Sequence, residues 1–337
     1  MGGFDLSEEV AQLVKEVLGP PDQKQRRAMA KIITLLESTK EEHREQADGA
    51  LNALLPHSGK AFRIGISGVP GAGKSTFIEA LGLYLVEHGE RVAVLAVDPS
   101  STIGGGSILG DKTRMERLSV HDRAFIRPSP SSGTLGGVAD KTREAMRVCE
   151  AAGYSVILVE TVGVGQSEAA VAGMTDLFVL LQLPNAGDDL QAIKRGITEL
   201  ADLVVINKAD LNEPAAAIAR THFLNALKLM GRHGHGDEQW QTEVLLASAL
   251  KQTGIEEFWQ AATRFREIQT GNGEFQDRRQ SQDKTWMWER IDSGLRDRFR
   301  RQPGMREALK SMSEQVLAGT LAPSVAAHRL LDLFHER

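Results

Sequence analysis

The chain has 337 residues, 41% of them hydrophobic and 25% charged, which is enough apolar material for a substantial core. Its formal net charge of −5 argues against a broad nucleic-acid-binding surface. No apolar run approaches the roughly 20 residues that cross a bilayer, and the first residues resemble neither a signal peptide nor a transit peptide. The single cysteine, Cys149, excludes an internal disulfide and a multi-thiolate metal site within one chain. We therefore expect a cytoplasmic protein that binds neither membranes nor nucleic acids.

The first 57 residues have a helical pattern. Apolar residues recur at helical spacing from Leu6 to Val17, and Gly19, Pro20 and Pro21 then interrupt the pattern. A second apolar stripe covers residues 28–36, and a third segment ends just before Pro56. This pattern predicts an N-terminal helical extension over residues 1–57.

Short β runs alternate with helical segments in residues 58–268. Such continuous apolar runs predict an α/β domain with a mostly parallel central sheet that helices cover on both faces. In sheets of this kind, ligands bind at the carboxyl ends of the strands. The predicted strands are residues 62–67, 92–97, 155–160, 177–183, 202–207 and 244–248.

The last part of the chain, residues 269–337, is predicted to be a C-terminal helical arm. It is polar from Gly271 to Lys284 and becomes helical again from Trp286 onward. Its apolar surface is too small for a separate core. We therefore expect the arm to pack against the main domain or against a second subunit in a homodimer.

Residues 68–75 match the phosphate-binding pattern G-x-x-x-x-G-K-[ST], and this segment is called the P-loop below. It lies between a predicted strand and a predicted helix, so the fold is that of a P-loop NTPase. Main-chain N–H groups of the glycine-rich loop and of the helix N-terminus would bind phosphate. Lys74 would reach the outer phosphates, and the Ser75 hydroxyl would hold Mg²⁺. The predicted phosphate-binding residues are Gly68, Val69, Pro70, Gly71, Ala72, Gly73, Lys74 and Ser75.

Acidic residues end two of the other predicted strands. Asp98 and Glu160 are placed to contact Mg²⁺ or its water shell, and the Gly163 N–H would contact a γ-phosphate. Loss of that phosphate would release the loop, as in nucleotide-regulated switches. Asp111, in the Gly-rich segment 104–115, would close toward Mg²⁺. Asp98 as a simple turn residue and segment 104–115 as a solvated loop remain alternatives.

The sequence NKAD, residues 207–210, predicts which base is bound. The Asp210 carboxylate can accept hydrogen bonds from the ring N–H and the amino group of guanine, whereas adenine presents an unprotonated ring nitrogen. The segment Ser248, Ala249 and Leu250 would offer a main-chain N–H to the guanine carbonyl oxygen. The predicted ligand is therefore GTP or GDP, held by Asn207, Lys208 and Asp210 together with this segment.

Several long motifs closely resemble the MeaB/ArgK/MMAA family, and the resemblance covers nearly the whole chain. It implies a P-loop GTPase of the SIMIBI branch, a group that commonly forms homodimers. Such proteins are chaperones of adenosylcobalamin-dependent acyl-CoA mutases, chiefly methylmalonyl-CoA mutase, and gate cofactor loading and repair. The motifs are GVPGAGKST (68–76), VLAVDPSS (94–101), GGSILGDKTRM (105–115), ETVGVGQSE (160–168), NKAD (207–210) and QDKTWMW (282–288).

The resemblance also assigns roles to individual residues. It implies that Lys74, Ser75 and Thr76 bind phosphate and Mg²⁺. It implies that Asp98, Asp111 and Glu160 belong to the metal and switch region. A third switch loop that responds to the mutase would contain Asp188, Gln191 and Lys194.

The resulting hypothesis is slow, Mg²⁺-dependent GTP hydrolysis, in which positioning and charge stabilisation do most of the work. Lys74 would neutralise developing charge, and either Asp98 or Glu160 would orient the attacking water. A nickel-insertion GTPase is an alternative, but it predicts clustered Cys and His ligands that this sequence lacks. A P-loop kinase would usually use ATP, against which residues 207–210 argue. A nucleotide-locked scaffold that never hydrolyses GTP is a further alternative.

Overall fold

The computed structural model describes residues 5–38, 40–97, 115–128, 135–161, 167–184, 195–229 and 239–335. It separates into two compact units, Met1–Arg279 and Gln280–Arg337. Within the described residues, no helix has both the length and the apolar character needed to cross a membrane.

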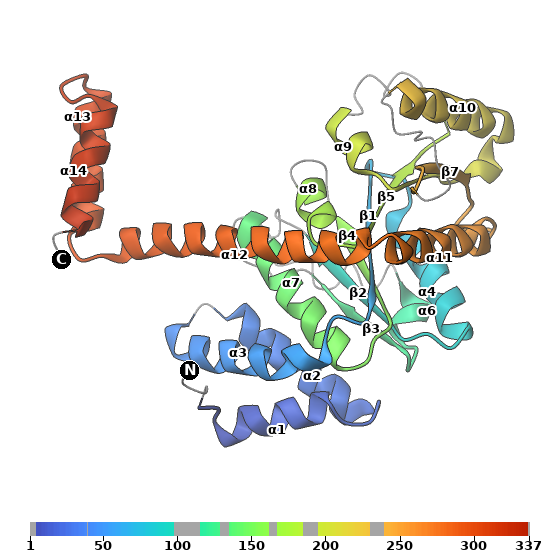
Figure 1. Cartoon of the computed structure of the whole chain (residues 1–337), viewed down its shortest axis with the longest axis horizontal. Helices are drawn as coiled ribbons and strands as arrows, with labels where there is room; N and C mark the ends of the chain where they lie inside the picture. Colours follow the sequence, from blue (N-terminus) through green and yellow to red (C-terminus); the bar gives the residue numbers. More distant parts are fainter. Residues whose placement is uncertain are drawn as a thin grey trace. The chain divides into compact units, whose positions relative to one another are not determined.

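A seven-stranded sheet forms the centre of the larger unit, with the strand order β3-β2-β4-β1-β5-β6-β7 (Figure 1). Neighbouring strands are parallel in every pair, so the predicted α/β fold with a parallel sheet is confirmed. Six strands overlap the six predicted runs, and the short β3 adds a seventh. The strands are β1 (Phe62–Gly68), β2 (Val92–Val97), β3 (Ala124–Arg127), β4 (Val156–Thr161), β5 (Leu177–Gln182), β6 (Leu203–Ile206) and β7 (Glu243–Leu246).

Helices cover both faces of this sheet because side chains alternate between the two faces of each strand. Val156 and Leu158 of β4 belong to one apolar layer, whereas Ile157 and Val159 belong to the other. The first layer includes α4 (Lys74–Glu87), α6 (Glu116–Ser119) and α11 (Ile255–Gly271). The second includes α7 (Leu135–Ala151), α8 (Ser167–Ala172), α9 (Arg195–Leu200) and α10 (Glu213–Leu229).

Three N-terminal helices form where the three apolar stripes predict them. Side chains at the helix starts support the first two, because Ser7 accepts a hydrogen bond from Val10 N and Asp22 accepts one from Gln25 N. Their apolar residues join the layer that contains α7. The helices are α1 (Glu8–Val17), α2 (Gln23–Glu37) and α3 (Glu41–Leu54), followed by the short 3₁₀ helix η1 (Leu55–His57). The predicted boundaries at 57/58 and 268/269 stay predictions.

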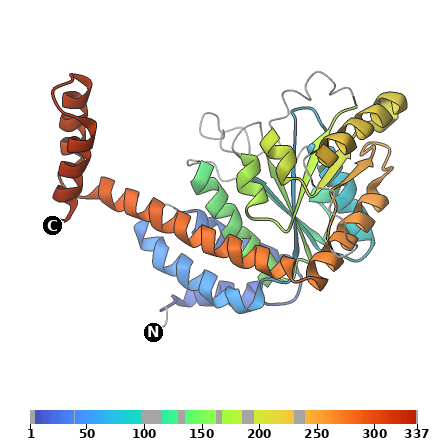
Figure 2. The same cartoon turned by 45° about the horizontal axis from the view of Figure 1, so that its top comes forward.

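The C-terminal residues form three helices, α12 (Glu274–Arg301), α13 (Met305–Leu317) and α14 (Pro323–His335). α12 begins in the larger unit and continues into the smaller one, so the polar segment 271–284 is helical from Glu274 onward. In the smaller unit, α13 and α14 lie side by side (Figure 2). The rings of Phe299 and Phe334 lie 5.5 Å apart, and Gln302 Nε2 donates to Leu333 O at 3.3 Å.

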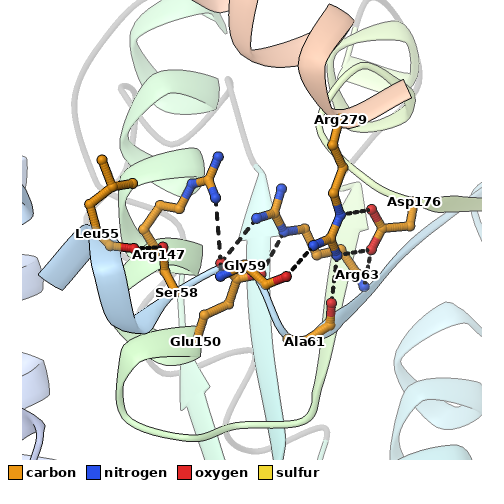
Figure 3. A network of polar contacts seen from close by, with 9 residues as sticks. All are labelled: Leu55, Ser58, Gly59, Ala61, Arg63, Arg147, Glu150, Asp176 and Arg279. Atoms are coloured by element: carbon orange, nitrogen blue, oxygen red, sulfur yellow. Dashed lines mark hydrogen bonds and ion pairs between the residues drawn. The ribbon is translucent and has the colours of Figure 1, made fainter. Parts of the chain in front are cut away.

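Arg279, near the start of α12, is inserted among the amino ends of the strands (Figure 3). Its guanidinium donates to both carboxylate oxygens of Asp176, at 2.7 and 2.6 Å, and to the carbonyl oxygens of Gly59 and Ala61. Asp176 also accepts from the main-chain N–H of Arg63 at 2.8 Å. A buried charge is tolerated only when it is paired and hydrogen-bonded, and this arrangement satisfies that condition. The beginning of α12 is thus fixed to β1 and β5 of the same unit.

Further ionic contacts surround this arginine. Arg63 donates to both carboxylate oxygens of Glu150, at 2.8 and 3.0 Å, and Glu150 also accepts from Gly59 N (Figure 3). Arg278 Nη1 donates to Asp202 Oδ2 at 3.0 Å, just before β6. The amino ends of the strands therefore hold a mostly buried ionic network.

Candidate nucleotide-binding site

The P-loop lies where the sequence predicts it, between the end of β1 at Gly68 and the start of α4 at Lys74. Gly71 and Gly73 have φ values of 80° and 86°, a backbone region that suits glycine. A Cβ atom added at Gly68 would lie 2.3 Å from the carbonyl oxygen of Leu181. The glycines therefore permit both the turn and its close approach to β5.

Lys74 and Ser75 begin α4, whose N-terminus carries partial positive charge. Lys74 Nζ donates to the carbonyl oxygen of Gly68 at 2.8 Å and to that of Val69 at 3.4 Å. Ser75 Oγ donates to Glu160 Oε1 at 3.0 Å, and Glu160 is 4% exposed at the end of β4. The structure therefore brings together three residues that the sequence assigns to phosphate and metal.

The remaining P-loop residues differ in exposure. Gly68 and Ala72 are buried, Val69 is half-buried, and Pro70 and Gly71 are exposed. Thr76, in the first turn of α4, is also exposed. The outer part of the loop is thus open to an incoming anion.

Asn207, which directly follows β6, bridges two loops. Its Nδ2 donates to the carbonyl oxygen of Ala72 in the P-loop at 2.8 Å, and its Oδ1 accepts from the main-chain N–H of Ala249 at 3.0 Å. Asn207 is 1% exposed. Both ends of its carboxamide therefore bind the protein itself, so Asn207 holds the P-loop beside the segment 248–250.

The rest of the NKAD motif forms a tight turn. Lys208 has a φ of 60°, and Ala209 N donates to Ala247 O at 3.0 Å. A Cβ atom added at Gly73 would lie 3.7 Å from Lys208 Cε, so the lysine side chain passes close to the P-loop. Asp210, in the 3₁₀ helix η4 (Ala209–Leu211), is exposed and open to solvent.

The segment that follows β7 is partly buried. Ser248 and Ala249 are 1% and 5% exposed, whereas Leu250 is 77% exposed. Ser248 Oγ accepts from Lys251 N at 3.2 Å, which closes the turn. No interaction between this segment and Asp210 is present among the described residues, so their joint action on a base stays a prediction.

Six predicted site residues lie outside the described residues. They are Asp98, Asp111, Gly163, Asp188, Gln191 and Lys194. Their assignments to metal, γ-phosphate and switch loops therefore stay predictions.

The sequence analysis did not identify one polar pair beside this site. Thr161 Oγ1 donates to Ser67 Oγ at 3.1 Å, and both side chains are buried. Ser67 immediately precedes the P-loop, and Thr161 immediately follows Glu160. A hydroxyl at the end of each of two apolar strands is the signal that could have indicated the pair.

Cys149 is fully buried in α7, and burial raises the pKa of its thiol well above the usual range. In the described part of the chain, no group of three or more His, Cys, Asp or Glu residues is placed to hold a metal ion. The nickel-insertion alternative predicts such a cluster, and residues 230–238, which include His233 and His235, lie outside the described residues.

A sequence profile of the family described as "Methylmalonyl Co-A mutase-associated GTPase MeaB" matches residues 29–304. This chain belongs to the MeaB family. It is a GTPase of the SIMIBI type, and the resemblance seen in its motifs is confirmed.

Individual proteins also resemble this chain over most of its length. A probable GTPase of Mycobacterium tuberculosis is 52% identical over 309 residues, which is 91% of each chain. The mouse (Mus musculus) protein named "Methylmalonic aciduria type A homolog, mitochondrial" is 49% identical over 325 residues, covering 93% of this chain and 77% of that one. The crystal structure of a LAO/AO transport system kinase superposes with a TM-score of 0.75 at 36% identity, covering 98% and 99% of the two chains.

Proposed function

We propose that this protein is a Mg²⁺-dependent GTPase chaperone that gates adenosylcobalamin loading and repair of an acyl-CoA mutase such as methylmalonyl-CoA mutase. The observation that carries the proposal is the match of residues 29–304 to a family described as mutase-associated GTPases. The arrangement of Lys74, Ser75, Glu160 and Asn207 around one loop supports the nucleotide part of it.

Phosphate binding would use groups whose present partners can be exchanged. Lys74 Nζ bonds to two carbonyl oxygens of its own loop, and phosphate oxygens would be stronger acceptors for its charge. The Ser75 hydroxyl and the Glu160 carboxylate offer the oxygen ligands that Mg²⁺ prefers, so they would hold the ion directly or through its waters. When bound, Mg²⁺ supplies neutralisation of the charge on the phosphates. The carboxylate that orients water is Glu160 or Asp98.

Guanine recognition would use Asp210, whose exposed carboxylate is able to receive the two N–H groups of the base. Asn207 would act mainly by holding the P-loop and the segment 248–250 beside each other. Lys208, with its side chain beside Gly73, would cover the nucleotide from the same side.

The smaller unit supports the proposed homodimer. One stretch of α12 exposes Met287, Trp288, Ile291 and Leu295, at 51%, 55%, 40% and 51% of their surfaces. Their spacing places them on one side of the helix. A second copy of the chain would remove this apolar surface from water. We assign the dimer to the cytoplasm, since its single cysteine needs no oxidising compartment.

Co-purification tests this function. Purified methylmalonyl-CoA mutase is mixed with the tagged chain in the presence of GDP, a non-hydrolysable GTP analogue or ADP. We expect a complex whose amount differs between GDP and the GTP analogue, and no response to ADP. Equal recovery with all three nucleotides, or no recovery with any of them, would contradict the proposal.

Single-turnover assays with GTP and ATP test the two alternative functions, a P-loop kinase and a nucleotide-locked scaffold. A kinase would transfer the phosphoryl group to a co-substrate, and a locked scaffold would leave GTP intact.

A further inference from the structure

The carboxyl-terminal tips of β1 and β4 lie beside each other, next to the P-loop. The main-chain pairing between these strands runs from Phe62 and Val156 to Ile66 and Glu160. The next residues on each strand are Ser67 and Thr161. At this level the two tips are joined by their hydroxyls, with Thr161 Oγ1 donating to Ser67 Oγ at 3.1 Å.

Each of these residues also has a main-chain neighbour on its other side. Ser67 is in register with Leu180 of β5, and Thr161 is in register with Val97 of β2. The hydrogen bond between the two hydroxyls therefore joins β1 to β4 in the middle of the sheet, one residue beyond the last main-chain pair of these strands. In the sequence, Val97 directly precedes Asp98 and Ser67 directly precedes Gly68, so residues predicted to serve metal and phosphate follow these positions.

The two hydroxyls are protected from water, since Ser67 is 1% exposed and Thr161 is 0% exposed. Neither side chain is thus placed to touch substrate. Each needs a partner, because a buried hydroxyl without one is costly. The bond between them gives each hydroxyl a partner.

Strand alternation places this bond on the face opposite Glu160. The Glu160 side chain points toward α4, where it accepts from Ser75 Oγ at 3.0 Å, so the adjacent Thr161 points to the other layer. On one face of the sheet, therefore, a hydroxyl bond joins the tips of β1 and β4, and on the other face Glu160 at the tip of β4 is bonded to Ser75 of α4. Because Ser75 follows β1 through the P-loop, the spacing between the tips of β1 and β4 influences how far Glu160 lies from Ser75.

We infer that Thr161 is a positioning residue for the nucleotide site: its hydroxyl bond to Ser67 fixes the tips of β1 and β4 so that Glu160 and Ser75 are correctly spaced for one magnesium ion. This inference rests on the proposed function, because it presumes that Ser75 and Glu160 serve Mg²⁺. The pair acts through Glu160 and is not itself catalytic.

The test compares three variants with a matched control. Thr161→Val keeps the shape of the side chain and removes the donor, Thr161→Ser restores a hydroxyl, and Ser67→Ala removes the same bond from β1. The control is Thr142→Val, since Thr142 is also buried but donates to Val138 O within α7 at 3.0 Å. The readout is the release rate of fluorescent GDP from the full-length protein as free Mg²⁺ is varied, with the thermal midpoint measured for each variant.

We expect Thr161→Val and Ser67→Ala to raise the Mg²⁺ concentration for half-maximal retention of GDP by about fivefold, the order expected for one lost hydrogen bond. Release without Mg²⁺ should not change. Thr161→Ser should restore the wild-type Mg²⁺ dependence, and the double variant of Thr161→Val and Ser67→Ala should be no worse than either single one, because both remove one bond. Thr142→Val should keep the wild-type Mg²⁺ dependence, even where it lowers the thermal midpoint.

Three results would overturn the inference: a wild-type Mg²⁺ dependence in folded Thr161→Val, an equal shift in Thr142→Val, or additive effects of the two single substitutions. Wild-type protein whose GDP release ignores Mg²⁺ would be a different result, since it would overturn the metal use in the proposed function itself.

Discussion

The two ends of the central sheet use polar side chains in opposite ways. At the carboxyl ends, Lys74 and Ser75 make bonds that a ligand can replace, and Asp210 is exposed. At the amino ends, Arg279 and Asp176 are buried and satisfy each other together with main-chain groups. Lys74, Ser75 and Asp210 are thus available for binding, whereas Arg279 and Asp176 are consumed in holding the fold. The comparison predicts that substitutions at the carboxyl ends of the strands change nucleotide binding with little loss of stability. Substitutions at the amino ends should lower stability and leave nucleotide binding unchanged.

The largest effect on stability is expected from Arg279→Met. Removing the guanidinium leaves Asp176 buried without its charged partner, which typically costs about 3–5 kcal/mol in the free energy of unfolding. Urea titration followed by circular dichroism measures this loss. The protein that remains folded should bind GDP with unchanged affinity. Strongly weakened GDP binding in the folded variant would show that the two ends are not independent.

Lys74→Ala should have the largest effect on activity. Loss of a charge aimed at the phosphates is expected to reduce GTP hydrolysis by about 10²–10³-fold, as for other electrostatic groups that stabilise a transition state. We expect a small change in the free energy of unfolding, because Lys74 is only half-buried and donates to carbonyl oxygens of its own loop. Single-turnover hydrolysis and urea titration provide the two measurements. Near-normal GTPase activity would contradict the assigned role of Lys74.

Asp210→Asn should change base preference while leaving the fold intact. The carboxylate is expected to contribute about 10–100-fold to GDP affinity, since hydrogen bonds to charged groups are strong. Xanthine carries a carbonyl where guanine carries its amino group, so the amide N–H of the D210N side chain can donate to it. Calorimetry with GDP, xanthosine diphosphate and ADP should therefore show weakened GDP binding and improved binding of the xanthosine form. An unchanged preference for GDP would place base recognition elsewhere.

The carboxyl end of the sheet was largely predictable from the sequence. Buried parallel strands are continuous apolar runs, and the P-loop has a fixed spacing of Gly, Lys and Ser. The bridging role of Asn207 was not predictable, because the motif indicates base recognition but not the bonds to Ala72 and Ala249. The short β3, which contains four residues and ends in Arg127, was missing from the predicted runs.

The amino end was not predictable, and the reason is physical. Segment 271–284 contains one apolar side chain, Phe275, and therefore no apolar stripe; Arg278 and Arg279 also fix the start of α12 to the sheet. Hydrophobic periodicity cannot detect a contact made by charges. Arg279 and Asp176 are also 103 positions apart, so no local pattern links them.

The smallest effect is expected from Arg264→Met, which is the matched control for Arg279→Met. Arg264 also makes a two-pronged contact with a carboxylate, donating to Glu243 at 2.7 and 2.9 Å. This pair is exposed, at 52% for the arginine and 33% for the glutamate side chain, so water and salt already screen it. Its loss should change the free energy of unfolding by about 1 kcal/mol or less in the same urea titration. A loss as large as that of Arg279→Met would mean that burial does not set how much an ion pair contributes to the free energy of unfolding of this protein.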